Sequence, residues 1–188
     1  MSDKTIESFE DEIAAFDKLA TSKQAALDVI YQEMQALAGQ LLEAKDGERP
    51  GLIKRRSSLA AERDALRDEV GEAKRRRDSA YLAIAQLEYD LALTEARRLA
   101  ELGSQQRKKL DEAIREEQHF LNSGRGKLPK AEGDAELLRI SAQLARARAE
   151  SQILARDIDQ AGNLAERAKA DLEAARAEIG ITSGPGDL

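Results

Sequence analysis

The chain has 188 residues, of which 35% are charged and only 3% are aromatic, and it contains neither cysteine nor tryptophan. The absence of cysteine excludes disulfides and thiolate metal sites, and the net charge of −6 disfavours general affinity for nucleic acid. A composition dominated by Ala, Leu, Glu, Lys and Arg indicates long helices or coiled coil rather than a globular core built on aromatic side chains.

Helix-breaking residues cluster at 46–51, at 123–133 and from 180 onward. They predict an all-α fold in a single unit, with helices over 3–46, 51–122 and 134–180 and a flexible tail at 181–188. The acidic N-terminal stretch has no apolar run, so no signal peptide is expected. The most apolar stretch, 80–93, contains three polar or acidic residues and is too short to cross a membrane, so no transmembrane segment is expected. The expected location is the cytoplasm, or the inside of a virion or larger assembly.

The first predicted helix carries a heptad pattern in which apolar residues alternate at spacings of three and four. Its two series are Ile6, Ile13, Ala20, Leu27, Met34 and Leu41, and Phe9, Phe16, Lys23, Ile30 and Leu37. This spacing keeps the side chains on one face, which is the pattern of a coiled-coil seam.

The middle helix is less regular. Its main series runs through Leu52, Leu59, Leu66, Ala73, Ala80 and Leu87, with Arg56, Arg63, Val70, Arg77, Ile84 and Leu91 as companions. After Leu91 the register changes, and we expect the face to continue through Leu99, Leu102, Leu110, Ile114 and Leu121.

The third helix repeats the clean pattern of the first. Its series are Leu137, Leu144, Ser151, Ile158, Ala165, Leu172 and Ile179, and Ile140, Ala147, Leu154, Ala161, Ala168 and Ala175. Four residues mark expected helix ends: Gly47 as a left-handed cap, Pro50 at a helix start, Asp134 as an N-cap, and Gly180 in a Schellman ending with Ile181.

Short connections between long helices predict antiparallel neighbours. Residue i of the first helix should face about residue 97 − i, and residue i of the third about 255 − i. The outer helices then overlap only around 76–93. The predicted architecture is an elongated antiparallel coiled coil of three long helices, with two helices at each end and three in the middle. Parallel self-association of opened chains is the alternative.

The same register predicts a structural aromatic cluster. It places Phe9 and Phe16 beside Tyr89 and Tyr81, so that four of the six aromatic residues would meet. Opposite net charges on helix one and on residues 51–77 favour this pairing.

The strongest basic run is "AKRRRD" at 73–78, and "QRKKLDE" at 106–112 is similar. A nucleic-acid or anionic-lipid patch is one interpretation. Acidic residues lie within and beside both runs and no aromatic side chain interleaves them, so a solvated, ion-paired helix face is favoured.

Enzymatic chemistry finds little support. Glu116 and His119 have the spacing of a di-iron helical element, but such a site needs a second copy of the element, and His119 is the only histidine. The chain has no cysteine, and its only histidine has no sequence context for a catalytic triad, so nucleophilic catalysis is not expected. We therefore expect no enzyme activity, no catalytic residues, no cofactor and no metal.

The connection "SGRGKLPKAEG" at 123–133 holds three glycines and three basic residues. It does not fit a phosphate-binding loop, because Leu128 follows Gly126-Lys127 and no strand precedes it. It is longer than a helix hairpin requires. A simple flexible turn is one interpretation, and the other is a partner-docking tip formed by Arg125, Lys127, Leu128, Pro129 and Lys130.

These features predict a structural or scaffolding protein that acts as a spacer or adaptor through protein partners and forms a homo-oligomer. By architecture alone it is similar to coiled-coil rods of bacterial export machines, to phage or virion components and to spacer subunits. The alternatives are a nucleic-acid-associated protein that uses its Arg-rich faces, and an export-apparatus stalk or peripheral membrane coiled coil.

Overall fold

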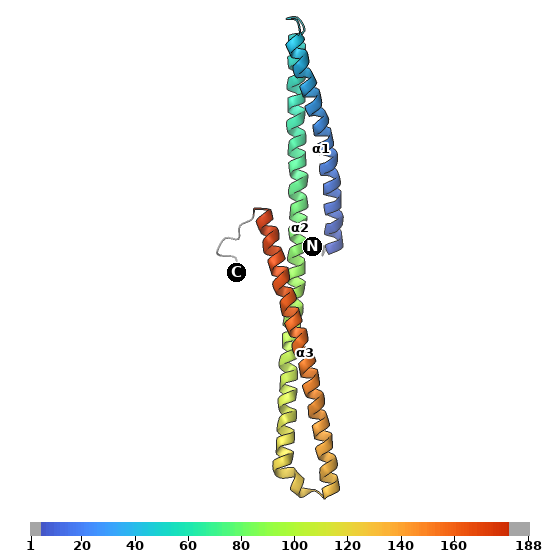
Figure 1. Cartoon of the computed structure of the whole chain (residues 1–188), viewed down its shortest axis with the longest axis vertical. Helices are drawn as coiled ribbons and strands as arrows, with labels where there is room; N and C mark the ends of the chain where they lie inside the picture. Colours follow the sequence, from blue (N-terminus) through green and yellow to red (C-terminus); the bar gives the residue numbers. More distant parts are fainter. Residues whose placement is uncertain (1–4, 181–188) are drawn as a thin grey trace. The chain divides into compact units, whose positions relative to one another are not determined.

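The computed structural model describes residues 5–180, except for the side chain of Arg125. Three long helices, α1 (Ile6–Glu43), α2 (Arg49–His119) and α3 (Lys130–Glu178), make up almost all of this range (Figure 1). No strand occurs between residues 5 and 180, so the predicted all-α class is confirmed. The predicted helix bounds differ from the observed ones by a few residues, and the predicted tail at 181–188 lies outside the described residues.

The chain divides into two compact units. The described residues of the first unit are 5–85 and 175–180, and those of the second are 86–174. The helix α2 contributes its first part to the first unit and its remainder to the second. The expected overlap of all three helices at 76–93 stays a prediction.

In the first unit, α1 begins with a side-chain cap. The Thr5 hydroxyl accepts a hydrogen bond from the backbone N–H of Ser8 at 3.3 Å, and the Ser8 hydroxyl donates back to the Thr5 carbonyl at 2.8 Å. These bonds satisfy groups that the first helical turn leaves without helical partners. Downstream of this cap, every predicted seam position of α1 is buried or half-buried, which confirms the heptad pattern.

The core of the first unit lies between α1 and the first part of α2. Ile30 and Leu37 of α1 pack with Leu59 of α2, and Met34, Leu52 and Leu66 surround this cluster. Fully burying one such aliphatic side chain contributes about 1.5–3 kcal/mol. The first helical hairpin therefore depends on a narrow apolar contact rather than on a broad core.

The register of this hairpin differs from the expected one. Asp17 was expected to face residue 80 but pairs with Arg77 at 3.3 Å, and Lys23 was expected to face residue 74 but pairs with Glu69 at 2.5 Å. The cause lies in the turn, because α2 already begins at Arg49 and takes up Pro50 as its second residue. The first turn of a helix tolerates proline, whose missing N–H has no helical acceptor there.

The second unit consists of the later part of α2, the connection at 120–129 and most of α3, with Ile140, Leu144 and Leu172 among the buried residues. Here the contacts nearest the connection keep the expected register, but Gly103 lies against Ile158 rather than near residue 152. Arg139 contacts Glu116 at 3.0 Å, as the rule 255 − i requires, and Gln106 donates a hydrogen bond to Glu150 at 3.0 Å, within one residue of the expected pairing. Every predicted seam position of α3 is buried or half-buried.

The matching face of α2 was predicted only in part. Leu99, Leu110 and Ile114 are half-buried, but Leu102 and Leu121 are exposed. The positions of α2 that face α3 in their stead are Gly103 and Gln106, which are small or polar, and the buried aromatic Phe120. A gap of about 280 Å³ remains beside Gly103, where Ala100, Ser104 and Ser151 also have short side chains. The positions of the leucines alone therefore do not predict which face of α2 packs against α3.

Two of the expected helix ends are also corrected. Gly47 lies in the connection between α1 and α2 and does not have a positive φ, so it is not a left-handed cap. Asp134 lies inside α3 rather than at its N-cap, because α3 begins at Lys130. Gly180 does adopt the left-handed conformation, with φ of 77°, and its N–H donates to the Ala177 carbonyl at 3.1 Å. Its expected apolar partner, Ile181, lies outside the described residues.

Two helical glycines of the second unit should respond oppositely to alanine. Gly162 has open space where a Cβ would stand, so Gly162→Ala should raise the free energy of unfolding by about 0.5–1 kcal/mol through helix propensity. At Gly103 an added Cβ would lie 2.6 Å from Cδ1 of Ile158, so Gly103→Ala should gain nothing or lose stability. Urea denaturation followed by circular dichroism measures both. Equal stabilisation by the two substitutions would contradict the close approach at Gly103.

Candidate functional site

The connection between α2 and α3 is folded rather than a plain turn. A π-helical turn covers Phe120–Gly124 and a 3-10 turn covers Arg125–Lys127. Phe120 is buried, with 9% of its surface exposed, and its ring lies against Gly124 so closely that a Cβ there would meet Cδ2 of the ring at 2.8 Å. A residue with a side chain at position 124 would therefore collide with the Phe120 ring. π-Helical turns such as this one are frequent at functional sites.

A groove of about 450 Å³ opens beside this connection. Its apolar wall consists of Phe120, Leu128 and Ile140, of which only Leu128 has substantial exposure, at 40%. The remaining lining residues are polar, charged or glycine: Glu116, His119, Gly124, Lys127 and Glu136. We refer to this feature as the tip groove. An apolar wall with a few polar groups at its edge is typical of a binding site.

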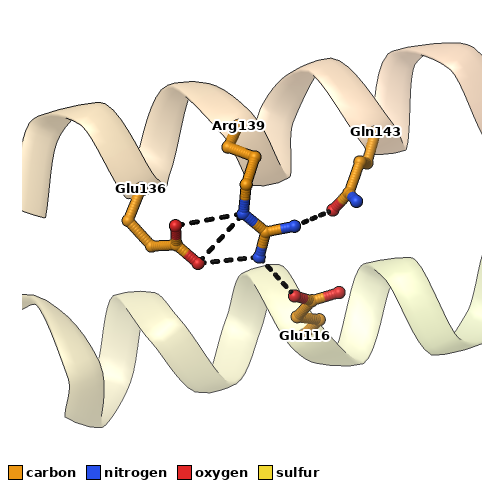
Figure 2. A network of polar contacts seen from close by, with 4 residues as sticks. All are labelled: Glu116, Glu136, Arg139 and Gln143. Atoms are coloured by element: carbon orange, nitrogen blue, oxygen red, sulfur yellow. Dashed lines mark hydrogen bonds and ion pairs between the residues drawn. The ribbon is translucent and has the colours of Figure 1, made fainter.

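Figure 2 shows the polar network that joins α2 to α3 beside the tip groove. Arg139 donates to Glu136 on its own helix at 2.7 Å, to Glu116 of α2 at 3.0 Å, and to the side-chain oxygen of Gln143 at 2.8 Å. Hydrogen bonds from Arg139 lower the pKa of Glu136, and those to Glu136 and then Glu116 raise the pKa of Arg139. The guanidinium thus holds two carboxylates of the groove in fixed positions.

The predicted tip residues occupy different places around this groove. Lys127 and Leu128 line it. Pro129 and Lys130 are exposed where α3 begins, and the Pro129 carbonyl accepts the N–H of Gly133 at 2.9 Å. The side chain of Arg125 lies outside what the structure describes.

Sequence reasoning missed the residues that form the floor and the polar side of the groove, namely Phe120, Ile140, Glu116, Glu136 and Arg139. One available signal was the spacing of Phe120 and Gly124, which places an aromatic ring over a glycine one helical turn later. A second was the register, which already put Arg139 opposite Glu116. Neither signal by itself indicates a groove.

The predicted aromatic cluster stays a prediction. Tyr81 is 49% exposed, whereas Phe9, Phe16 and Tyr89 are half-buried. Because the first hairpin pairs Asp17 with Arg77, the register that brought Phe16 opposite Tyr81 is displaced by a few residues.

The arginines of the basic run are engaged in ion pairs. Arg75 and Arg76 both donate to Glu72, at 2.9 and 2.8 Å, and these bonds, that of Arg76 first, lower the pKa of Glu72. Arg77 donates to Asp78 at 2.7 Å and to Asp17 of α1 at 3.3 Å. The ion-paired interpretation of this helix face is the one that these contacts support.

His119 has a local partner as well. Its Nδ1 lies 3.2 Å from the hydroxyl of Ser123, which also donates to the His119 carbonyl at 2.9 Å. Among residues 5–180, no three His, Asp or Glu side chains gather as a metal site would require. No helix within this range has the length and apolarity needed to cross a membrane.

Comparison with known proteins gives no family assignment. The sequence matches no protein-family model, and neither the curated proteins nor the solved structures contain a match.

The Arg139 network predicts a specific pH dependence. Glu136 has a lowered pKa in the folded chain, so its stabilising contribution is complete above its ordinary value of 4.5 and is lost as the pH falls through the lower folded value. At pH 7, Glu136→Gln should lower the melting temperature by about 1–2 °C, because the network is exposed to solvent. At about pH 2 this difference should disappear.

Thermal melts followed by circular dichroism at several pH values measure this effect. Glu173→Gln is the matched control, because the Glu173 carboxylate lies 3.9 Å from Lys169 and has a weaker contact to lose. A difference between Glu136→Gln and the unmodified protein that persists at pH 2 would show that the charge of Glu136 is not what stabilises the hairpin.

Proposed function

We propose that this chain is a non-enzymatic structural protein that acts as a spacer or adaptor in a larger assembly, such as a virion or a bacterial export machine. In this proposal the tip groove is where it docks a protein partner. The observation that carries the proposal is that the connection between α2 and α3 is folded around Phe120 and is lined by apolar wall residues. A connection that only reverses the chain direction needs a few residues and no buried aromatic side chain.

The chemistry of the groove indicates the kind of partner. Phe120, Leu128 and Ile140 would receive a bulky apolar side chain. Lys127 and Lys130 are exposed beside them, and Arg139 offsets one of the two negative charges of the nearby Glu116 and Glu136. A protein segment that presents an apolar residue next to an acidic one fits this arrangement.

Two alternatives from the sequence have weaker support. A nucleic-acid-associated role needs arginines that are available to phosphates, but Arg75, Arg76 and Arg77 are already bound to carboxylates. A role as an export-apparatus stalk or peripheral membrane coiled coil is compatible with the helical hairpins, and liposome flotation tests its membrane form.

Site-specific photo-crosslinking tests docking at the tip groove. A crosslinkable amino acid at Leu128, introduced in cells that produce the protein naturally, should give a discrete adduct with a partner. The added substitution Lys127→Glu should reduce that adduct at least severalfold, because it replaces an attractive charge at the groove edge by a repulsive one.

Leu121 provides the matched control. It lies in the same connection and has a similar exposure of 48%, but it does not line the groove. The same crosslinker at Leu121 should give little or no adduct. Equal adducts at both positions, or none at Leu128, would refute docking at this groove.

Binding to nucleic acid is tested by gel shift at about 50 mM salt, where phosphate contacts are strongest. We expect no shift at micromolar protein concentration. A shift that disappears as salt rises and is lost when Arg75, Arg76 and Arg77 are replaced by Ala would favour the nucleic-acid alternative.

A further inference from the structure

The seam of the second hairpin is interrupted where α2 and α3 both carry small residues. Ser151 is the one polar residue in the two seam series of α3, and Gly103 of α2 lies against the same helix. Both residues line the gap of about 280 Å³, which we call the seam gap. A helix pair loses packing contacts wherever a layer of its seam is left unfilled. The hairpin therefore gives up stability at this layer, as binding sites commonly do.

The apolar part of the lining comes from both helices. Leu154, Ala155 and Ile158 line the seam gap from α3, and Ala100 lines it from α2. Leu154 and Ile158 are half-buried seam residues, so the apolar part belongs to the ordered contact between the helices. A gap of about 280 Å³ has the volume of about nine liquid waters, which suits a hydrocarbon chain of about six carbons.

The polar part of the lining includes Ser104, Ser151 and Arg107. Within residues 5–180, the two serine hydroxyls and the Arg107 guanidinium form no hydrogen bond or ion pair. These groups are therefore available to a ligand. A guanidinium presents several N–H donors in one plane and binds a carboxylate through two parallel hydrogen bonds.

The nearby carboxylates do not take up Arg107. The Glu150 carboxylate, next to Ser151 on α3, accepts a hydrogen bond from Gln106 at 3.0 Å and lies 4.0 Å from Arg146. Asp111 is one helical turn from Arg107 on α2, but the described part of the chain shows no ion pair between them. The positive charge of Arg107 thus remains uncompensated beside an apolar space.

We propose that the seam gap binds a small anionic amphiphile, a carboxylate with a short hydrocarbon chain. The chain fills the layer between Gly103 and Leu154, and the carboxylate accepts hydrogen bonds from Arg107. The Ser104 and Ser151 hydroxyls donate to whichever carboxylate oxygen they reach. A ligand of this size should have a dissociation constant of about 1 mM. The site is separate from the tip groove and does not depend on the proposed scaffold function.

Thermal melts of the full chain with hexanoate test the ligand class. At about 10 mM, hexanoate should raise the melting temperature by about 3–5 °C, because it binds only the folded hairpin. Acetate provides the carboxylate without the chain, and hexylammonium provides the chain with the opposite charge. Both should give a much smaller shift at the same concentration. Equal shifts from hexanoate and hexylammonium, or from hexanoate and acetate, would overturn the proposal.

Filling the seam gap tests its location. Ser151→Leu should raise the melting temperature without ligand, because the new side chain occupies the empty layer, and it should abolish the effect of hexanoate. Gln152→Leu is the matched control, since it adds the same side chain at an exposed neighbouring position that does not line the gap. This control should keep the hexanoate shift. A hexanoate shift that survives in Ser151→Leu would refute binding in the seam gap.

A second variant avoids any change in packing. Arg107 is exposed, so Arg107→Gln should leave helicity unchanged and weaken hexanoate binding about tenfold through loss of the charged hydrogen bonds. Lys108→Gln removes the same charge from an exposed neighbour outside the lining and should have little effect. Equal weakening by both substitutions would show general charge attraction rather than a site at Arg107.

Titration of the ¹⁵N-labelled protein with hexanoate, followed by nuclear magnetic resonance, gives the affinities and the position of the ligand. The amide signals of Gly103 and Ser151 should shift together and saturate, whereas that of Leu128 should not move. Saturable shifts at Leu128 with none at Gly103 would place the ligand in the tip groove and overturn the proposal. Docking of a protein partner at the tip groove would be unaffected by either result, because the crosslink at Leu128 tests it independently.

Discussion

The rest of the structure depends on one constraint, the narrow apolar stripe that each helix must bury. With few aromatic residues, the chain has no broad core, and stability comes from side chains spaced by three and four along each hairpin. In the first unit this contact centres on Ile30, Leu37 and Leu59. In the second unit it runs along α3 through Ile140, Leu144 and Leu172, against a face of α2 that includes Gly103. Most other positions remain exposed, so the charged side chains pair with one another across the solvated surface.

The end of the second hairpin departs from this regular pattern, and the candidate site is there. A heptad seam cannot continue around a turn, so the last ring of the seam, Phe120, folds against Gly124 and closes the end of the hairpin. Arg139 then ties the two helices together through Glu136 and Glu116. The tip groove lies between the Phe120–Gly124 contact and the Arg139 network. Of its apolar wall residues, Leu128 is the one that this packing leaves exposed.

The tip groove lies at the closed end of the second hairpin, where apolar and basic groups meet. The ion pairs of Glu72 with Arg75 and Arg76 account for the basic run without invoking a nucleic acid.

Periodicity and breakers in the sequence were sufficient to determine the all-α class, the three helices, the seams of α1 and α3 and the register of the second hairpin near its connection. They act locally or through a regular repeat, so the order of residues contains them directly. Only the tertiary structure decided the rest. The first hairpin is displaced because α2 accepts Pro50 in its first turn. Gly103 rather than Leu102 faces α3, where the side chain of Ile158 lies against it. The tip groove forms because Phe120 packs on Gly124 while Arg139 bridges two helices. Each of these depends on which distant atoms meet, and a pattern of residue types does not specify that.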